Sequence, residues 1–184
     1  MMFTMPVDEQ VSLGLVEKRH AGQLFALIDR NRDRHRQWLR WSTTVTDVDG
    51  VRERIAALLR EYAETGCFCA FILEHGRAVG LIYHAHCDIP NSMVGIAYWI
   101  DADSEGRGLV TRAVEAVTRH SIERMGMRRV EIVCDEQNTR SQAIPQRLGF
   151  TREGVIRAAY TMPDGRAVNA VIYGMLDTDW KASQ

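Results

Sequence analysis

Residues 103–111 read DSEGRGLVT and join an apolar segment to a segment with helical periodicity. Two glycines one residue apart, Gly106 and Gly108, allow the backbone to adopt positive φ and to approach a ligand closely. The first N–H groups of the helix that follows have no partners inside the helix, and the helix dipole attracts an anion. The stretch therefore indicates a phosphate site, although an ordinary glycine turn explains it equally well.

The loop matches neither of the two common nucleotide-binding patterns. A dinucleotide-binding turn needs a third glycine in the pattern G-x-G-x-x-G, and a P-loop needs Gly-Lys followed by Ser or Thr. After Gly108 the chain continues with Leu109, Val110 and Thr111, so both requirements fail. What remains is a strand, a tight glycine turn and a helix N-terminus, to which Thr111 adds a hydroxyl donor.

Hydrophobic periodicity predicts strands and helices on both sides of the loop. Short apolar runs predict strands, and apolar residues three and four apart predict helices. The predicted strands are 11–18, 67–74, 78–87, 93–101, 128–135, 155–162 and 167–176, and the predicted helices are 21–30, a helix from Asp47 or Asp49 to Gly66, 110–125 and 139–147. A meander followed by strand–helix–strand crossovers favours a mixed α/β sheet with helices on both faces.

The bulk composition is that of one globular domain, which we expect to span residues 1–184. The net charge of −1 gives no general attraction to nucleic acid or to an anionic membrane. No apolar run approaches the roughly 18 residues of a membrane span. The N-terminus lacks the basic region and apolar run of a signal peptide, so we expect a cytoplasmic protein.

The four cysteines are Cys67, Cys69, Cys87 and Cys134, and none of them belongs to a C-x-x-C pair. Cys67 and Cys69 are two residues apart in an apolar run, so on a strand they would share a face. We expect reduced, mostly buried thiols rather than a metal site.

The loop resembles the acetyl-CoA pyrophosphate loop of the GCN5-related N-acetyltransferase (GNAT) superfamily. The pattern of that loop is Gln/Arg-x-x-Gly-x-Gly/Ala, and residues 105–110 occupy its six positions. Two positions depart from the pattern, because Glu105 stands where Gln or Arg is usual and Val110 stands where a small residue is usual. A carboxylate beside a pyrophosphate is unfavourable unless it points away.

Segments on both sides of the loop strengthen the resemblance. The preceding GIAYWID, residues 95–101, is similar to the family's fourth strand, which typically splays from its neighbour to admit pantetheine. Downstream, Asn138, Ser141 and Leu148–Phe150 resemble the N-x-x-S…LGF signature of the RimJ/RimL-type branch, which acetylates ribosomal-protein N-termini. The segment FTREGVIR, residues 150–157, resembles that branch's entry to its sixth strand. The resemblance therefore covers nearly the whole chain.

The resemblance implies an α/β fold with a central, mostly antiparallel sheet, splayed fourth and fifth strands, acetyl-CoA as co-substrate and no metal. Backbone groups around Trp99, Ile100 and Asp101 would pair with the pantetheine amides. The pyrophosphate would bind the loop and the start of its helix, and Asn138 would contact pantetheine besides capping a helix. The implied cofactor-binding residues are Trp99, Ile100, Asp101, Gly106, Arg107, Gly108, Leu109, Val110, Thr111, Asn138 and Ser141.

Acetyl transfer to an amine requires a neutral amine, a polarised thioester carbonyl and a proton for the departing thiolate. The resemblance implies direct attack in a ternary complex, with Ser141 as the hydrogen-bond or proton donor to the thiolate. The alternative for Ser141 is an exposed hydroxyl early in a short helix. Pro145 lies four residues later and removes the i+4 partner of the Ser141 carbonyl, so we expect a kink or an early helix end there.

The sequence leaves the general base open. In the serine-acetylating members a glutamate lies six residues after the glycine of a Glu-Gly pair, a position that Tyr160 occupies here. A tyrosine with its ordinary pKa of about 10 is a poor base, although it can donate or accept a hydrogen bond. Glu136, His84 and His86 are the other candidates, and a chain of water molecules is a further alternative. A lone histidine on a strand is more often structural.

Residues 30–40 carry five arginines together with Trp38, and Trp41 follows directly. The resemblance places a similar Trp-containing segment beside the acceptor site, so the segment could form a groove wall. It could also recognise an acidic partner. The third interpretation is a solvated helix face with its aromatic side chains tucked underneath.

Together these observations predict an acetyl-CoA-dependent N-acetyltransferase that acts on a protein or peptide N-terminal amine. One alternative is an enzyme for a small amine, such as a polyamine, an amino acid or an aminoglycoside. Another is a CoA-binding sensor or partner protein without turnover, which Glu105 and Tyr160 both motivate. Because related enzymes are often dimers, we expect a homodimer, and we expect no direct nucleic-acid or membrane partner.

Overall fold

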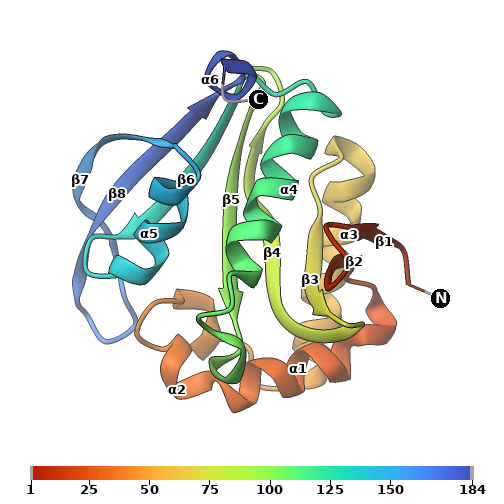
Figure 1. The fold of residues 1–184 in the computed structure, drawn as a ribbon. Helices are drawn as coiled ribbons and strands as arrows, with labels where there is room; N and C mark the ends of the chain where they lie inside the picture. Colours follow the sequence, from red (N-terminus) through yellow and green to blue (C-terminus); the bar gives the residue numbers. More distant parts are fainter. Residues whose placement is uncertain (1, 183–184) are drawn as a thin grey trace. The chain divides into compact units, whose positions relative to one another are not determined.

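The computed structural model describes residues 2–182, apart from the side chains of residues 42 and 43 (Figure 1). Its strands are β1 (Thr4–Pro6), β2 (Val11–Leu15), β3 (Cys69–Glu74), β4 (Arg77–Asp88), β5 (Met93–Ile100), β6 (Arg129–Asp135), β7 (Thr151–Thr161) and β8 (Ala167–Leu176). Its α-helices are α1 (Ala21–Arg30), α2 (Arg32–His35), α3 (Val48–Thr65), α4 (Leu109–Glu123), α5 (Thr139–Arg147) and α6 (Asp177–Ala182). Short 3-10 turns are η1 (Lys18–His20), η2 (Arg40–Thr43) and η3 (Ala102–Ser104).

Hydrogen bonding joins the strands in the order β1-β2-β3-β4-β5-β6-β8-β7. The pairs β1–β2, β2–β3, β3–β4, β6–β8 and β7–β8 are antiparallel, and β5–β6 is parallel. The parallel pairing joins only Met93–Gly95 to Arg129–Glu131, although β6 continues to Asp135. The strands β5 and β6 correspond to the family's fourth and fifth strands, and their short pairing agrees with the expected splay. The mostly antiparallel mixed sheet confirms the predicted fold class.

The contacts within the chain divide it into two compact units. The first contains the residues up to Tyr83 together with Tyr98–Leu109, and the second contains His84–Ala97 and the residues from Val110 onward. The boundaries fall within β4, within β5 and at the first residue of α4. The glycine turn therefore belongs to the first unit, and all but the first residue of the helix that it starts belongs to the second.

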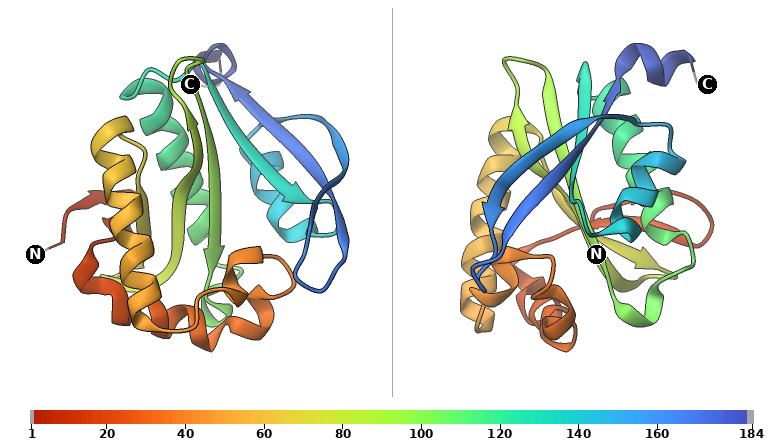
Figure 2. Two further views of the ribbon diagram at one scale, coloured as in Figure 1. Left: turned by 180° about the vertical axis from the view of Figure 1, so that it is seen from behind. Right: turned by 90° about the vertical axis from the view of Figure 1, so that its left-hand side faces the viewer.

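The core of the first unit lies between the helices α1 and α3 and the strands β3 and β4. Figure 2, in the view from behind, shows α3 in front of these strands. The helices bury the apolar stripes that their spacing predicts, namely Leu24, Leu27 and Ile28 of α1 and Val51 and Ile55 of α3. Each such side chain contributes about 1.5–3 kcal/mol to folding, which is how α1 and α3 are held on the sheet.

Polar and glycine signals set the ends of α3. Asp47 is its N-cap, because a carboxylate oxygen of Asp47 accepts a hydrogen bond of 2.7 Å from the Gly50 N–H. Gly66 follows the helix in the left-handed conformation with φ 78°. Of the two aspartates that the sequence offered as caps, the structure therefore selects Asp47 over Asp49.

In the second unit, β6 lies between β5 and β8, and α5 packs against β6 and β7 (Figure 1). The side chain of Tyr173 on β8 is fully buried. Its hydroxyl donates to the Gln142 side-chain carbonyl at 3.1 Å and accepts from the Gln146 amide at 2.9 Å. These bonds satisfy a buried hydroxyl and attach α5 to the sheet.

Most predicted elements are confirmed, with boundaries that differ by a few residues. β7 starts at Thr151, earlier than expected, and β1, α2 and α6 were not predicted because such short segments show no periodicity. The helix α5 continues past Pro145 to Arg147, so the expected early end at the proline is wrong. Pro145 removes only one backbone bond and its ring is buried, which offsets that loss.

The cysteines do not share one state. Cys69 and Cys134 are free and buried, as expected. Cys67 and Cys87 are disulfide-bonded, so the expectation of reduced thiols is wrong for these two residues. Disulfide formation depends on the distance between Cα atoms, a tertiary property that sequence spacing does not give. Within residues 2–182, no group of three or more His, Cys, Asp or Glu side chains is arranged to hold a metal ion.

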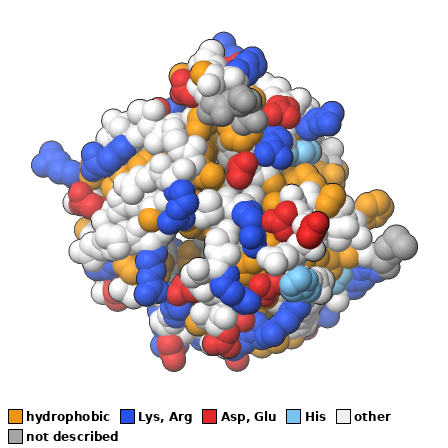
Figure 3. Space-filling model, in the orientation of Figure 1, with side chains coloured by type: hydrophobic (Ala, Val, Ile, Leu, Met, Phe, Trp, Pro, Cys, Tyr) orange, Lys and Arg blue, Asp and Glu red, His pale blue; other side chains and the backbone are white. Residues whose placement is uncertain are grey.

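Charged groups of both signs are interspersed on the surface. Figure 3 shows Lys and Arg side chains mixed with Asp and Glu side chains on the face seen in Figure 1, in keeping with the net charge of −1. None of the helices in residues 2–182 has the length and hydropathy needed to cross a bilayer.

Candidate functional site

The turn before α4 has the backbone geometry of an anion cradle. Gly106 and Gly108 have φ values of 73° and 70°, in the left-handed region that costs other residues about 1–2 kcal/mol. A Cβ atom added to either glycine would meet nothing within 4 Å, so space is open where a ligand would approach. Leu109, the first residue of α4, is 2% exposed, which directs its side chain into the core and leaves the backbone as the binding element.

The unusual acidic residue of the turn is neutralised. Arg34 of α2 forms an ion pair with Glu105, and the two side chains are only 34% and 28% exposed. A bound guanidinium cancels most of the repulsion that the carboxylate would exert on a phosphate. Glu105 differs from the Gln or Arg of the family pattern, and its negative charge is compensated by an arginine that lies 71 residues earlier in the chain.

The segment before the turn is anchored by the same arginine-rich region. Arg30 forms an ion pair with Asp101, and the Asn31 amide donates to the other Asp101 oxygen at 3.0 Å. Asn31 also accepts from the Ala102 N–H at 3.1 Å. Asp101 is 2% exposed, and such burial of a carboxylate requires this pairing.

Two residues expected to bind the cofactor have other partners. The Asp101 N–H donates to the Val79 carbonyl at 2.7 Å, so it is not available to pantetheine, and Asp101 instead anchors the segment. The Arg107 guanidinium forms an ion pair of 2.8 Å with Glu74 on β3. Arg107 therefore offers its backbone N–H to a ligand rather than a free cation. Trp99 is 6% exposed, which places its ring in the core and leaves only its backbone for pantetheine.

In the second unit, a cation stands at the first turn of α4. Arg147, the last residue of α5, donates a hydrogen bond of 3.0 Å to the Thr111 hydroxyl. The Thr111 oxygen is thus occupied as an acceptor, and its proton remains available for an anion. Val110 is partly buried beside it. A positive group beside unpaired helix N–H groups is favourable for a phosphate.

Ser141 is held near the end of β6 by its own helix cap. The Asn138 side chain accepts from the Ser141 N–H at 3.1 Å, which confirms the predicted cap of α5. The Ser141 hydroxyl lies 3.2 Å from the Cys134 sulfur, and either group could be the donor. The hydroxyl is thus part-buried beside a thiol rather than an exposed group on a helix surface.

His84 has a structural environment. It is 4% exposed, and its Nε2 lies 3.0 Å from the hydroxyl of Ser121, which donates to the Val117 carbonyl. Because that hydroxyl proton is used, the histidine donates and the serine accepts. Burial, and secondarily the charge of His120, lowers the pKa of His84 to about 4. These contacts place His84 in the packing between β4 and α4, and they do not favour it as the general base.

Tyr160 follows an irregularity in β7, and Glu136 lies just beyond the end of β6. Between Ile156 and Tyr160 the register with β8 shifts, and Ala158 in the shifted part has φ 48°. The Asn169 side chain joins this region to Glu136, because it accepts from the Ala158 N–H at 3.0 Å and donates to Glu136 at 2.9 Å. The bulge therefore sets the position of Tyr160, and Asn169 fixes the exposed carboxylate of Glu136.

A family model described as "Acetyltransferase (GNAT) domain" matches residues 11–151, a range that includes the glycine turn, Asn138 and Ser141. The chain belongs to this family. "Putative ribosomal N-acetyltransferase YdaF" from Bacillus subtilis (strain 168) is 32% identical over 189 aligned positions, which cover 100% of both chains. "Ribosomal-protein-serine acetyltransferase" from Escherichia coli (strain K12) is 26% identical and covers 88% of this chain and 90% of that protein. These relatives confirm the predicted RimJ/RimL-type branch.

Solved structures show the same fold. One of them, "RimL- Ribosomal L7/L12 alpha-N-protein acetyltransferase" in complex with coenzyme A, has a TM-score of 0.91 at 23% identity and covers 95% of this chain and 98% of its own. Another such structure is that of the microcin C7 self-immunity acetyltransferase MccE in complex with acetyl-CoA and AMP, with a TM-score of 0.86 at 24% identity. Coenzyme A and acetyl-CoA are therefore ligands of proteins that share the fold of this GNAT chain.

Sequence reasoning missed the residues that support the GNAT loop from outside it. These residues are in the arginine-rich segment 30–40, for which the sequence left three interpretations open. Arg30 and Asn31 bind Asp101, and Arg34 neutralises Glu105. The density of arginines in residues 30–40 was the available signal. Nothing in the sequence gave their partners.

Proposed function

We propose that this chain transfers the acetyl group of acetyl-CoA directly to the N-terminal amine of a protein, with a ribosomal protein as acceptor. The observation that carries the proposal is the open turn of Gly106 and Gly108, in the left-handed conformation, at the start of α4 in a GNAT chain. The two relatives described above are named a putative ribosomal N-acetyltransferase and a ribosomal-protein-serine acetyltransferase, which supports that class of acceptor.

In this proposal, backbone groups bind the co-substrate. The N–H groups from Gly106 to Thr111 hold the pyrophosphate, and the backbone of Trp99 and Ile100 pairs with pantetheine. The Asn138 side chain is used as a helix cap, so its contact with pantetheine is secondary. Acetyl-CoA supplies the activated thioester, and the residues of the chain orient it and handle the protons.

Ser141 is the proposed donor to the departing thiolate. Its hydroxyl can give a hydrogen bond to a sulfur anion, and the Cys134 thiol beside it can donate to the Ser141 oxygen at the same time. A donor of this kind stabilises charge that develops only as the thioester breaks. The contact with Cys134 therefore orients the hydroxyl without consuming its proton.

Two residues are proposed for handling the amine proton. Glu136 offers an exposed carboxylate just beyond β6, and Tyr160 offers a hydroxyl just beyond the bulge in β7. We assign Glu136 as the proton acceptor, directly or through water, and Tyr160 as a hydrogen-bonding partner of the acceptor. The assignment follows from their ordinary chemistry, since a carboxylate accepts a proton at neutral pH and a phenol does not.

Both units are proposed to form one GNAT domain in a cytoplasmic homodimer. The family match runs across every boundary between the units, which supports a single domain. Val133, Ile156 and Leu176 of the second unit are 48%, 50% and 42% exposed, and the strand register places them on one face of β6, β7 and β8. Such a row of exposed apolar side chains supports an interface with a second copy. Sedimentation equilibrium of the wild-type chain and of Val133→Glu tests it.

The activity is tested by mixing the protein with acetyl-CoA and matched acceptors and measuring thiol release. The acceptors are peptides with a free N-terminus, the same peptides with a blocked N-terminus and an internal lysine, and small amines. We expect release only with a free N-terminus, with mass spectrometry locating the acetyl group on the α-amine. Thiol release with small amines alone would show that the acceptor is a small amine and not a protein N-terminus. Tight CoA binding without thiol release from any mixture would show a CoA-binding protein without turnover.

A further inference from the structure

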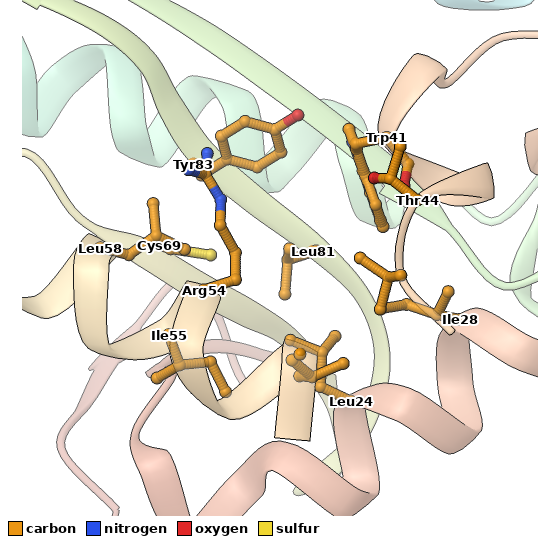
Figure 4. Close-up of a pocket in the computed structure, with 13 residues that line it drawn as sticks. Leu24, Ile28, Trp41, Thr44, Arg54, Ile55, Leu58, Cys69, Leu81 and Tyr83 are labelled. Atoms are coloured by element: carbon orange, nitrogen blue, oxygen red, sulfur yellow. The ribbon is translucent and has the colours of Figure 1, made fainter. Parts of the chain in front are cut away.

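An apolar cavity of about 530 Å³ lies within the first unit, under the helices α1 and α3 (Figure 4). Its size falls in the range of about 300–1,000 Å³ that small-ligand sites occupy. Aliphatic side chains from both helices and from β4 form most of its wall, among them Leu24, Ile55 and Leu81. A site of this composition takes up an apolar group, because water inside it gains few hydrogen bonds.

Among the described residues that line the cavity, Arg54 alone carries a charge. The Arg54 side chain, on α3, reaches over the cavity with its guanidinium towards Tyr83 (Figure 4). No hydrogen bond or ion pair to this guanidinium is found among the described residues. The neighbouring polar groups do not neutralise it, because burial raises the pKa of the Cys69 thiol to about 12 and raises that of Tyr83. Arg54 is therefore an open partner for an anionic group.

Trp41 links this cavity to the segment proposed to bind pantetheine. Its side chain lines the cavity together with that of Tyr83. The Trp41 ring also lies 6.3 Å from the ring of Trp99, measured between centroids. Trp41 is therefore next to both the cavity and the residue that precedes Ile100 on β5.

The region between Trp41 and Trp99 also carries polar atoms without partners. His35 packs edge-on against Trp99 with ring centroids 4.5 Å apart, and it is 4% exposed. Within residues 2–182, neither ring nitrogen of His35 has a hydrogen-bond partner, and the same holds for the Trp99 indole nitrogen. Buried polar atoms normally have partners. Their clustering here supports a ligand whose polar groups enter beside Trp41.

We propose that this cavity is the side-chain pocket of the acceptor, and that it selects an N-terminal segment in which an apolar side chain lies close to an aspartate or glutamate. The apolar side chain fills the space lined by Leu24, Ile55 and Leu81. The acceptor carboxylate pairs with Arg54. The assignment rests on the proposed acetylation of protein N-termini and adds to it the class of acceptor sequence.

Matched variants on one helix test the pocket. Arg54→Gln removes the cation, and Arg60→Gln removes a second exposed arginine of α3 that does not line the cavity. Leu58→Trp fills the cavity from its edge, whereas Leu59→Trp adds the same volume at a half-buried position outside it. Each protein is assayed with four peptides that combine an apolar or a serine side chain with a glutamate or a glutamine nearby. Binding of the same peptides, labelled with a fluorophore, is measured by anisotropy in the presence of CoA.

For the wild-type protein we expect the peptide with both the apolar side chain and the glutamate to have the lowest KM. Arg54→Gln should raise that KM about tenfold and abolish the preference for glutamate over glutamine. Leu58→Trp should abolish the preference for the apolar side chain, and the two control variants should behave as wild type. The affinity of all four variants for CoA alone should stay within twofold of wild type.

Other outcomes separate the pocket from the activity. If peptides are acetylated and Arg54→Gln and Leu58→Trp match their controls, the pocket assignment is wrong and the activity stands. If no peptide is acetylated but the acidic apolar peptide binds, and Arg54→Gln weakens that binding, the pocket stands and the proposed activity fails. If no peptide is acetylated or bound, both are wrong.

Discussion

Replacing Arg34 by glutamine should weaken CoA binding by leaving Glu105 uncompensated. Glu105 lies three residues before Gly108, so its carboxylate is within about 10 Å of a phosphate bound at that turn. Two unit charges 8 Å apart interact by about 2 kcal/mol at an effective dielectric constant near 20. Both side chains of the pair are partly exposed, and salt screening reduces this repulsion to about 1–1.5 kcal/mol. The dissociation constant of CoA should therefore rise about tenfold.

Isothermal titration of CoA into four proteins distinguishes this mechanism from others. Glu105→Gln should bind CoA more tightly than wild type, because Arg34 is then a free cation. The double variant should bind as wild type does, because both charges are gone. Arg36→Gln is the matched control, since Arg36, which follows α2, pairs at 3.6 Å with the exposed Asp33 of that helix. A double variant as weak as Arg34→Gln would refute charge compensation and show that Arg34 contacts CoA directly.

Three further outcomes follow from the same geometry. Gly108→Asp should keep the fold, as measured by circular dichroism, but reduce CoA affinity at least 100-fold by adding both strain and a negative charge; retained affinity would exclude the turn as the phosphate site. Ser141→Ala should lower kcat about 10- to 100-fold with unchanged CoA affinity, as stopped-flow and titration would show; full activity would remove its proton-donor role. Burial, together with the charge of Arg34, lowers the pKa of His35 to about 4, so the unfolded state binds more protons and stability falls as the pH drops from about 6.5 towards 4. The unfolding free energy of the wild-type protein should fall between pH 7 and pH 5, and His35→Leu should make that fall smaller by roughly 2 kcal/mol, as measured by urea denaturation. An equal fall in the wild type and the variant would contradict this.

Local signals in the sequence predicted most of the elements and the position of the glycine turn. The stripes Leu24–Ile28 and Val51–Ile55, the glycine after α3 and the Asn138 cap each act within one or two turns of chain, and each was confirmed. The resemblance gave the family because its motifs are also short and regularly spaced. These features need only neighbouring residues, so they can be read before the chain is folded.

Long-range pairings could not be predicted in this way. The compensation of Glu105 by Arg34, the anchoring of Asp101 by Arg30 and Asn31, and the disulfide bonding of Cys67 depend on distances across the fold. A local sequence pattern does not predict which distant residues will lie close together. Folding closes loops of many different lengths, so the partners can be any number of residues apart.

The catalytic assignments show the same division. The sequence alone left the base open among Tyr160, Glu136, His84 and His86, although a tyrosine is a poor base and a lone strand histidine is more often structural. Tertiary structure distinguishes them, because it buries His84 against Ser121 and leaves the Glu136 carboxylate exposed. The sequence by itself therefore determined the family, the turn and the helix caps. Only the tertiary structure decided which charges are neutralised, which titratable groups are buried and where the apolar cavity under α1 and α3 lies, since these depend on packing between distant segments.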